Sequence, residues 1–179
     1  MEIANGLLSA ARFCASPNCD ERPGDEISLI VVHSISLPAG HFGSDYIESL
    51  FCNRLDVDEH PDFVDLAGLK VSSHVLIRRD GYLLQFVPFD KRAWHAGESC
   101  YMERTNCNDF SIGIELEGTD KNGYRGVQYD VLARVCQALC HEYGIVRTNI
   151  VGHSDIAPGR KTDPGPGFDW PRLRTAVGL

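Results

Sequence analysis

The sequence predicts a mixed α+β fold of the α/β class, in a single domain over residues 1–179, with a central mixed β-sheet flanked by helices. Residues 28–36 (SLIVVHSIS) are a short β-branched run typical of a buried strand. Residues 110–118 (FSIGIELEG) alternate apolar and polar side chains, as a strand does. Residues 127–143 repeat apolar side chains at helical spacing. Strands and helices are interspersed without regular alternation, which favours a mixed sheet.

The first half of the chain adds a helix and a hairpin. Ser44 is a candidate helix cap, because apolar residues recur at helical spacing just after it, at Tyr46, Ile47, Leu50 and Phe51. Residues 53–70 mix Asp, Pro and Gly, which predicts a long connection. Residues 72–88 (SSHVLIRRDGYLLQFVP) predict two strands joined by a turn at Asp80-Gly81.

The second half ends in a strand, a loop and a helix. Residues 96–109 are polar and predict a loop. After the long helix, NIVGH (149–153) predicts a short strand that ends at His153. The Gly/Pro-rich segment 154–167 predicts a loop, and Asp169 with Pro171 predicts the start of a final helix.

Composition indicates a globular protein and excludes some functions. The 179 residues include 17 Lys plus Arg and 25 Asp plus Glu, for a net charge of −8, and 43% are hydrophobic. A chain of about 150 residues hides roughly 70% of its unfolded surface, so a real core is expected. The acidic balance disfavours a nucleic-acid binder and a polybasic membrane binder. We expect a monomer with a small-molecule partner.

The N-terminus and the cysteines indicate a cytoplasmic location. The opening MEIANGLLSAARFC has no basic residue before its apolar patch, so we expect no secretory signal. The seven cysteines form no CxxC pair, and free thiols suit a reducing compartment. Cys136 and Cys140, beside His141, could be half of a metal site or two small apolar residues on a buried helix face; the second interpretation is favoured.

Three polar residues at element ends could form a metal site. His33 lies near the end of the first buried strand, His153 ends another, and Asp163 follows in a constrained loop. Two imidazoles and a carboxylate are a common catalytic zinc shell with one position open for water. Taken singly, each histidine is more often a core residue and the aspartate more often a turn residue.

Three further residues could act beside that site. Glu115 lies beside Gly113 and is a candidate base, although a solvent-facing strand residue is the alternative. Lys161 could stabilise an oxyanion, with a surface lysine as the alternative. His95, in AWHAG, is a candidate wall of a pocket.

Five segments carry a resemblance to a known family. They are LIVVHSISLPAGHFG, VSSHVLIRRDG, FVPFDKRAWHAG, CNDFSIGIELEGTD and GHSDIAPGRKTDPGPGFDW, in that order. Together they resemble the cytosolic 1,6-anhydro-N-acetylmuramyl-L-alanine amidases, the AmpD family, over roughly residues 5–175. The wider superfamily includes phage lysozyme-type amidases and peptidoglycan recognition proteins, and its fold has a central mixed sheet with flanking helices.

The resemblance implies a reaction and a set of roles. The reaction is hydrolysis of the amide between the lactyl group of 1,6-anhydro-N-acetylmuramic acid and L-alanine, in muropeptides recycled from the cell wall. His33, His153 and Asp163 match the ligands of one zinc ion. Glu115 and Lys161 match the catalytic pair.

The resemblance also implies substrate contacts, where this chain departs from its relatives. Trp94 matches a residue that lines the substrate groove. Three further positions are thought to touch substrate. At the position of Ser34 the family often has Asn, and at the positions of Lys70 and Asn106 it commonly has Arg. Because these residues differ, the preference for sugar or peptide stays open.

Two alternatives to an enzyme remain at this stage. Some superfamily members bind wall fragments without cleaving them, after losing zinc ligands. A zinc ion could also have a purely structural role and hold the C-terminal loop in place. Such a site would be closed, with a fourth ligand such as a cysteine.

Overall fold

Two neighbouring parallel strands form the centre of the structure, a computed structural model that describes residues 1–179. They are β5 (Leu29–Ile35) and β11 (Ser111–Glu117), and their register places Glu115 opposite His33. All seven residues of β11 are buried. The alternative that Glu115 is a solvent-facing strand residue is therefore wrong, because a central strand with parallel neighbours is covered on both faces.

The sheet is mixed, as predicted. Its order is β12-β5-β11-β6-β7-β3, and its other strands are β12 (Ile150–Gly152), β6 (Val75–Ile77), β7 (Leu83–Gln85) and β3 (Arg12–Phe13). Strand β12 runs parallel to β5, and β6 runs parallel to β11. The predicted hairpin is confirmed, since β6 and β7 pair antiparallel around Asp80-Gly81. Gly81 has φ +85°, a left-handed conformation that glycine adopts without strain.

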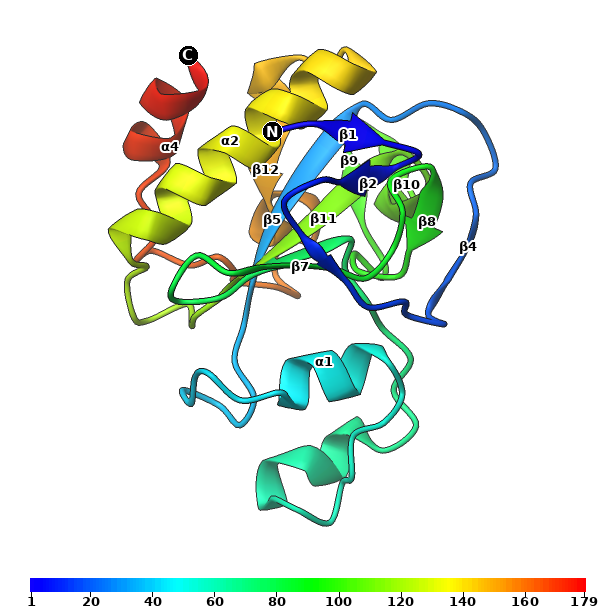
Figure 1. The fold of residues 1–179 in the computed structure, drawn as a ribbon, viewed down its shortest axis with the longest axis vertical. Coiled ribbons are helices and arrows are strands. Elements are labelled where there is room, and N and C mark those ends of the chain that lie inside the picture. The colour runs from blue at the N-terminus through cyan, green and yellow to red at the C-terminus, as the bar shows by residue number, and fades with distance from the viewer.

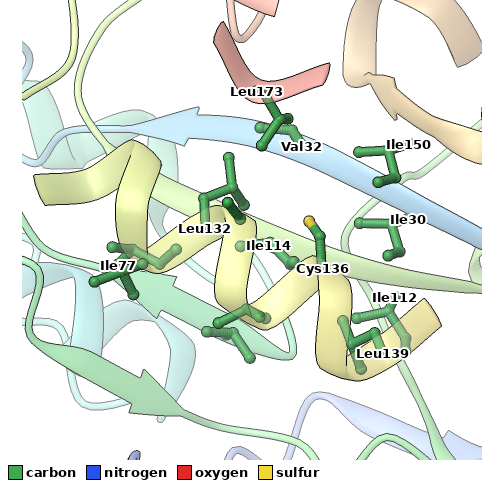
Figure 2. Close-up of a cluster of buried hydrophobic side chains, with 14 of the residues drawn as sticks. Ile30, Val32, Ile77, Ile112, Ile114, Leu132, Cys136, Leu139, Ile150 and Leu173 are labelled. Atoms are coloured by element: carbon green, nitrogen blue, oxygen red, sulfur yellow. The ribbon is translucent and has the colours of Figure 1, made fainter. Parts of the chain in front are cut away.

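One face of the sheet is covered by α2 (Gly126–Tyr143) and α4 (Trp170–Val177), which lie against each other (Figure 1). The apolar stripe of α2 packs on side chains of β5 and β11 (Figure 2). The labelled residues that meet there are Ile30, Val32, Ile112, Ile114, Leu132, Cys136 and Leu139. The predicted cap of the last helix is confirmed, because the Asp169 side chain accepts a hydrogen bond from the Arg172 backbone at 3.0 Å.

Replacing the side chain at the centre of this contact should destabilise the fold. Leu132 is fully buried between α2 and the sheet. We expect Leu132→Ala to lower the free energy of unfolding by about 2–5 kcal/mol, because transfer energy is lost and a cavity is left. Urea unfolding followed by circular dichroism measures the change. The matched variant Leu179→Ala, at a residue 54% exposed, should stay within about 0.5 kcal/mol of the wild type, and equal losses in both variants would contradict this packing.

The other face carries shorter elements and loops. Helix α1 (Tyr46–Phe51) and the 3₁₀ helix η1 (Pro61–Leu66) pack with the outer part of the sheet and lie apart from α2 (Figure 1). Helix α3 (His153–Ile156) follows β12 directly. The remaining elements are β1 (Ile3–Ala4), β2 (Leu7–Leu8), β4 (Cys19–Glu21), β8 (Lys91–Ala93), β9 (Cys100–Tyr101), β10 (Arg104–Thr105), η2 (Cys107–Asp109) and η3 (Arg147–Asn149).

Several sequence expectations need correction on this face. The predicted connection over 53–70 contains η1, and the predicted loop over 96–109 contains β9, β10 and η2. The cap residue of α1 is Asp45, whereas the Ser44 hydroxyl donates to the Leu37 carbonyl at 2.9 Å. His153 begins α3 and does not end the preceding strand.

The structure also shows the state of the cysteines and the character of the helices. All seven cysteines are free thiols. Cys136 is fully buried in the core and Cys140 is partly buried against it, which agrees with the favoured interpretation of this pair as small apolar residues on a buried helix face. No helix has the length and apolar character needed to cross a membrane.

Candidate active site

The candidate site lies where parallel strands end. His33 is on β5, Glu115 is opposite it on β11, and His153 follows β12, which is the other neighbour of β5. Because the carboxyl ends of parallel strands meet at one edge of a sheet, residues far apart in sequence come together there. Asp163 reaches the same edge from the loop after α3, where its backbone carbonyl accepts a hydrogen bond from Ser154 at 2.9 Å.

The three predicted ligand residues converge on one another. The Nδ1 atoms of His33 and His153 are 2.9 Å apart. Asp163 Oδ2 lies 3.1 Å from His153 Nδ1 and 3.4 Å from His33 Nδ1. Both imidazoles are buried, and the carboxylate is partly exposed. The tertiary structure thus forms the cluster that the sequence suggested.

The donor atoms of this cluster fit a divalent metal ion. The Ala96 carbonyl lies 3.2 Å from His153 Nε2 and can only accept a hydrogen bond, so Nε2 carries the proton. The lone pair of His153 is then on Nδ1 and faces the Asp163 carboxylate and His33. Electron-pair donors that converge in this way repel one another unless a proton or a cation lies between them. Two imidazole nitrogens and one carboxylate oxygen are a recognised zinc donor set.

The protonation states of the cluster suit metal binding. Burial lowers the pKa of His33 to about 4, against the opposing effect of the Asp163 carboxylate. Burial of Asp163 opposes its ionisation, but an imidazole of His153 or His33 that carries a proton on Nδ1 outweighs this and holds the pKa of the carboxyl well below its usual value. Neutral His33 and ionised Asp163 are the forms that coordinate a metal at neutral pH.

Glu115 has a carboxylate atom with no protein partner. The residue is 8% exposed, and its Oε2 is buried without a hydrogen bond. Burial raises the pKa of the Glu115 carboxyl well above its usual value, the nearby Asp163 charge adds to the rise, and Lys161 opposes it. A buried acid with a shifted pKa beside a metal-type cluster is typical of a group that exchanges protons during a reaction.

A cavity of about 300 Å³ opens onto this cluster. Its polar lining includes His33, Ser34, His95, Glu115, His153, Lys161 and Asp163, and its apolar wall includes Leu37, Leu50, Phe51, Leu66, Leu69, Val71 and Trp94. Lys70 is not on this wall. It lines a neighbouring cavity of about 190 Å³ that shares three leucines with the first. The structure therefore brings together every predicted site residue except Lys70 and Asn106, which directly precedes η2 and lines neither cavity.

His95 contacts a member of the cluster directly. Its Nδ1 lies 3.0 Å from His33 Nε2, and its Nε2 lies 3.2 Å from the Ser111 hydroxyl oxygen. Burial lowers the pKa of His95 well below its usual value, with the three neighbouring imidazoles acting in the same direction. His74, one ring further on, accepts from the Gly113 backbone at 3.0 Å and is a satisfied core residue.

Sequence reasoning missed two residues that hold the loop beside the cluster. The Asn108 side-chain oxygen accepts the backbone N–H groups of His95 and Ala96 at 3.1 and 2.8 Å. The Arg160 guanidinium donates to the carbonyl of Ala96 at 2.6 Å and to that of Glu98. No local pattern marks either role, because Asn108 and Arg160 lie 12 or more residues along the chain from the backbone groups that they hold.

No cysteine belongs to the cluster. The group of metal-type donor atoms that lie within 4.8 Å of one another consists of His33, His153 and Asp163. The alternative of a closed structural site with a cysteine as fourth ligand is therefore wrong.

Comparison with known proteins gives consistent matches. The family model Amidase_2, described as N-acetylmuramoyl-L-alanine amidase, matches residues 23–166. The chain is 56% identical over 178 residues to the 1,6-anhydro-N-acetylmuramyl-L-alanine amidase AmpD of Escherichia coli (strain K12), which covers 99% of this chain and 97% of that relative. Its identity to the AmpD of Haemophilus influenzae is 44% over 178 residues, with 98% and 97% covered.

Solved structures give the same picture. A crystal structure of a selenomethionine derivative of AmpD aligns with a TM-score of 0.97 at 55% identity, covering 99% of each chain. The E. coli amidase AmiD, in complex with anhydro-N-acetylmuramic acid-L-Ala-D-gamma-Glu-L-Lys, aligns with a TM-score of 0.61 at 31% identity. That alignment covers 84% of this chain and 57% of AmiD.

Proposed function

This chain belongs to the Amidase_2 family of N-acetylmuramoyl-L-alanine amidases, and from that membership we propose that it is a zinc-dependent 1,6-anhydro-N-acetylmuramyl-L-alanine amidase. The bond cleaved is the amide between the lactyl group of the anhydro-sugar and L-alanine of a muropeptide. We place this activity in cytoplasmic recycling of peptidoglycan, with the whole of residues 1–179 acting as one amidase domain and the protein as a monomer. The names of its full-length relatives support the substrate.

One observation carries the proposal. A metal-type cluster of His33, His153 and Asp163 lies in the same cavity as Glu115, whose buried Oε2 has no protein partner. Amide hydrolysis needs an activated water and a group that moves its proton, because the leaving nitrogen departs only when protonated. A muropeptide-binding module would need neither, so the complete set favours the enzyme.

Each residue has a distinct chemical role in this proposal. His33, His153 and Asp163 would hold one zinc ion through two Nδ1 atoms and a carboxylate oxygen. Zinc, when bound, lowers the pKa of a coordinated water to about 7 and polarises a carbonyl. Glu115 would accept the proton of the attacking water and pass it to the alanine nitrogen. Lys161, on the exposed side of the cavity, would donate to the developing oxyanion.

The cavity walls suit an amphipathic substrate. Trp94 offers an apolar face to the sugar, and Ser34 offers polar atoms to the substrate from the polar lining, whereas both ring nitrogens of His95 face His33 and Ser111. Lys70 can meet only a part of the substrate that extends into the neighbouring cavity. A carboxylate of the peptide stem is the group of opposite charge that would reach it.

The decisive assay follows cleavage of a purified anhydromuropeptide by chromatography. We expect release of the anhydro-sugar and the free peptide, loss of this activity after removal of metal with a chelator, and its return when zinc is added. Binding of the muropeptide without cleavage, by the zinc-loaded protein, would favour the binding module. Full activity after verified metal removal would contradict zinc dependence.

A further inference from the structure

A histidine ligand must hold its lone pair on the nitrogen that faces the metal. A neutral imidazole carries its proton on either nitrogen, and the partner of the other nitrogen decides which. For His153, the Ala96 carbonyl decides it. For His33, the outer nitrogen faces no carbonyl and no carboxylate. It faces another imidazole, that of His95, which can donate or accept at 3.0 Å.

The direction of the hydrogen bonds beyond His95 resolves this ambiguity. The Ser111 hydroxyl lies 2.5 Å from the Cys107 carbonyl, which can only accept, so the single hydroxyl proton points there. The Ser111 oxygen must then accept from His95 Nε2 at 3.2 Å. Neutral His95 with its proton on Nε2 has a lone pair on Nδ1. That lone pair accepts a proton from His33 Nε2, which leaves the His33 lone pair on Nδ1, toward His153 and Asp163.

A glycine in the central strand β11 leaves space for the His95 ring, although glycine lowers the stability of a strand. This glycine, Gly113, lies in the middle of the strand. A β-carbon at this position would come within 2.4 Å of the His95 ring, so only glycine leaves room for the imidazole beside the strand. The loop that carries His95 also carries Ala96, whose carbonyl faces His153. The Asn108 side chain holds the backbone N–H groups of both His95 and Ala96. One segment therefore orients both imidazole ligands.

We propose that His95 is a positioning residue of the zinc site, which works through Ser111 and the Cys107 carbonyl to hold His33 in the tautomer that binds metal at Nδ1. This inference rests on the proposed zinc-dependent function for the identity of the metal. It gives His95 a task distinct from contact with substrate. Outer partners of ligand histidines are typically worth about 10–100-fold in metal affinity.

Nuclear magnetic resonance of the zinc-loaded wild-type protein tests the proposal without any variant. We expect His33 to be metallated at Nδ1 and to carry a slowly exchanging ring proton on Nε2, with a dipolar contact to the His95 ring. Metal on His33 Nε2, or rapid exchange of that ring proton with water, would overturn the proposal.

A pair of variants tests the energetic effect. His95→Asn keeps an amide oxygen near the position of Nδ1, whereas His95→Phe keeps a ring but offers no acceptor. We expect His95→Phe to weaken zinc binding about 10–100-fold, measured by competition with a chelator, and His95→Asn to stay within about threefold of the wild type. Equal zinc affinities of the two variants would refute a role through the hydrogen bond. His141→Phe, an exposed substitution at the end of α2, is the matched control.

The zinc affinity of a Gly113→Ala variant and the cleavage of muropeptide by the wild type separate the positioning role of His95 from the proposed reaction. Gly113→Ala should displace the His95 ring and weaken zinc binding as His95→Phe does, with no change to any ligand. If zinc affinity follows these expectations but the wild type cleaves no muropeptide, the positioning role stands and the proposed reaction fails. If the wild type cleaves muropeptide but the His95→Phe variant binds zinc normally, the reaction stands and the positioning role fails.

Discussion

Glu115→Gln should lower the turnover of anhydromuropeptide at least about a hundredfold, since a positioned base typically contributes about 10²–10⁴ in rate. The amide of glutamine has nearly the shape of the carboxylate but cannot accept a proton. Because Oε2 of Glu115 has no protein partner, the substitution breaks no hydrogen bond at that atom. The loss should therefore fall on the chemical step and leave the fold intact.

Two measurements on the same preparation make this result specific. Zinc content should remain near that of the wild type, because Glu115 is not among the clustered donor atoms. Glu142→Gln, at an exposed position near the end of α2, should leave turnover unchanged. Near-normal turnover of Glu115→Gln, with zinc bound, would remove Glu115 from the mechanism.

Asp163→Ala should lose the metal. The carboxylate supplies the anionic member of the donor set and lies 3.1 Å from His153 Nδ1. Loss of an outer partner costs about 10–100-fold in metal affinity, and loss of a ligand should cost more. After dialysis against a weak chelator, elemental analysis should find zinc in the wild type and almost none in the variant, and amidase activity should be lost with it.

The control for Asp163→Ala is Asp58→Ala, which removes an exposed carboxylate far from the cluster in sequence. Circular dichroism should show that both variants are folded, so that lost zinc reports the ligand and not the fold. Full zinc occupancy in Asp163→Ala would refute the ligand assignment.

Local patterns predicted the elements that their own residues stabilise. The β-branched run at 28–36, the helical stripe at 127–143 and the cap at Asp169 all form nearly where expected, because each signal depends on neighbours in sequence. The short pieces were missed. The segment 96–109 contains few apolar residues, and its two strands, of two residues each, pair only with one another around Met102 and Glu103, so they carry no apolar alternation that a pattern could show.

The alternation in β11 shows where such reasoning fails. It separated correctly the face that packs on α2 from the face that carries Glu115. It could not show that the second face is also covered, since that depends on the position of the strand in the sheet and on the loop that holds His95.

The sequence by itself determined a set of candidate residues, because polar side chains that interrupt or follow buried apolar runs can be recognised from neighbouring residues alone. Resemblance of motifs then implied the family, and the comparisons confirm it. Only the tertiary structure decided that β12, β5 and β11 lie side by side, which brings His153, His33 and Glu115 to one edge. The contact between the rings of His95 and His33 also follows only from the tertiary structure. Strand pairing and ring orientation depend on the balance of packing over the whole molecule, and no short segment contains that information.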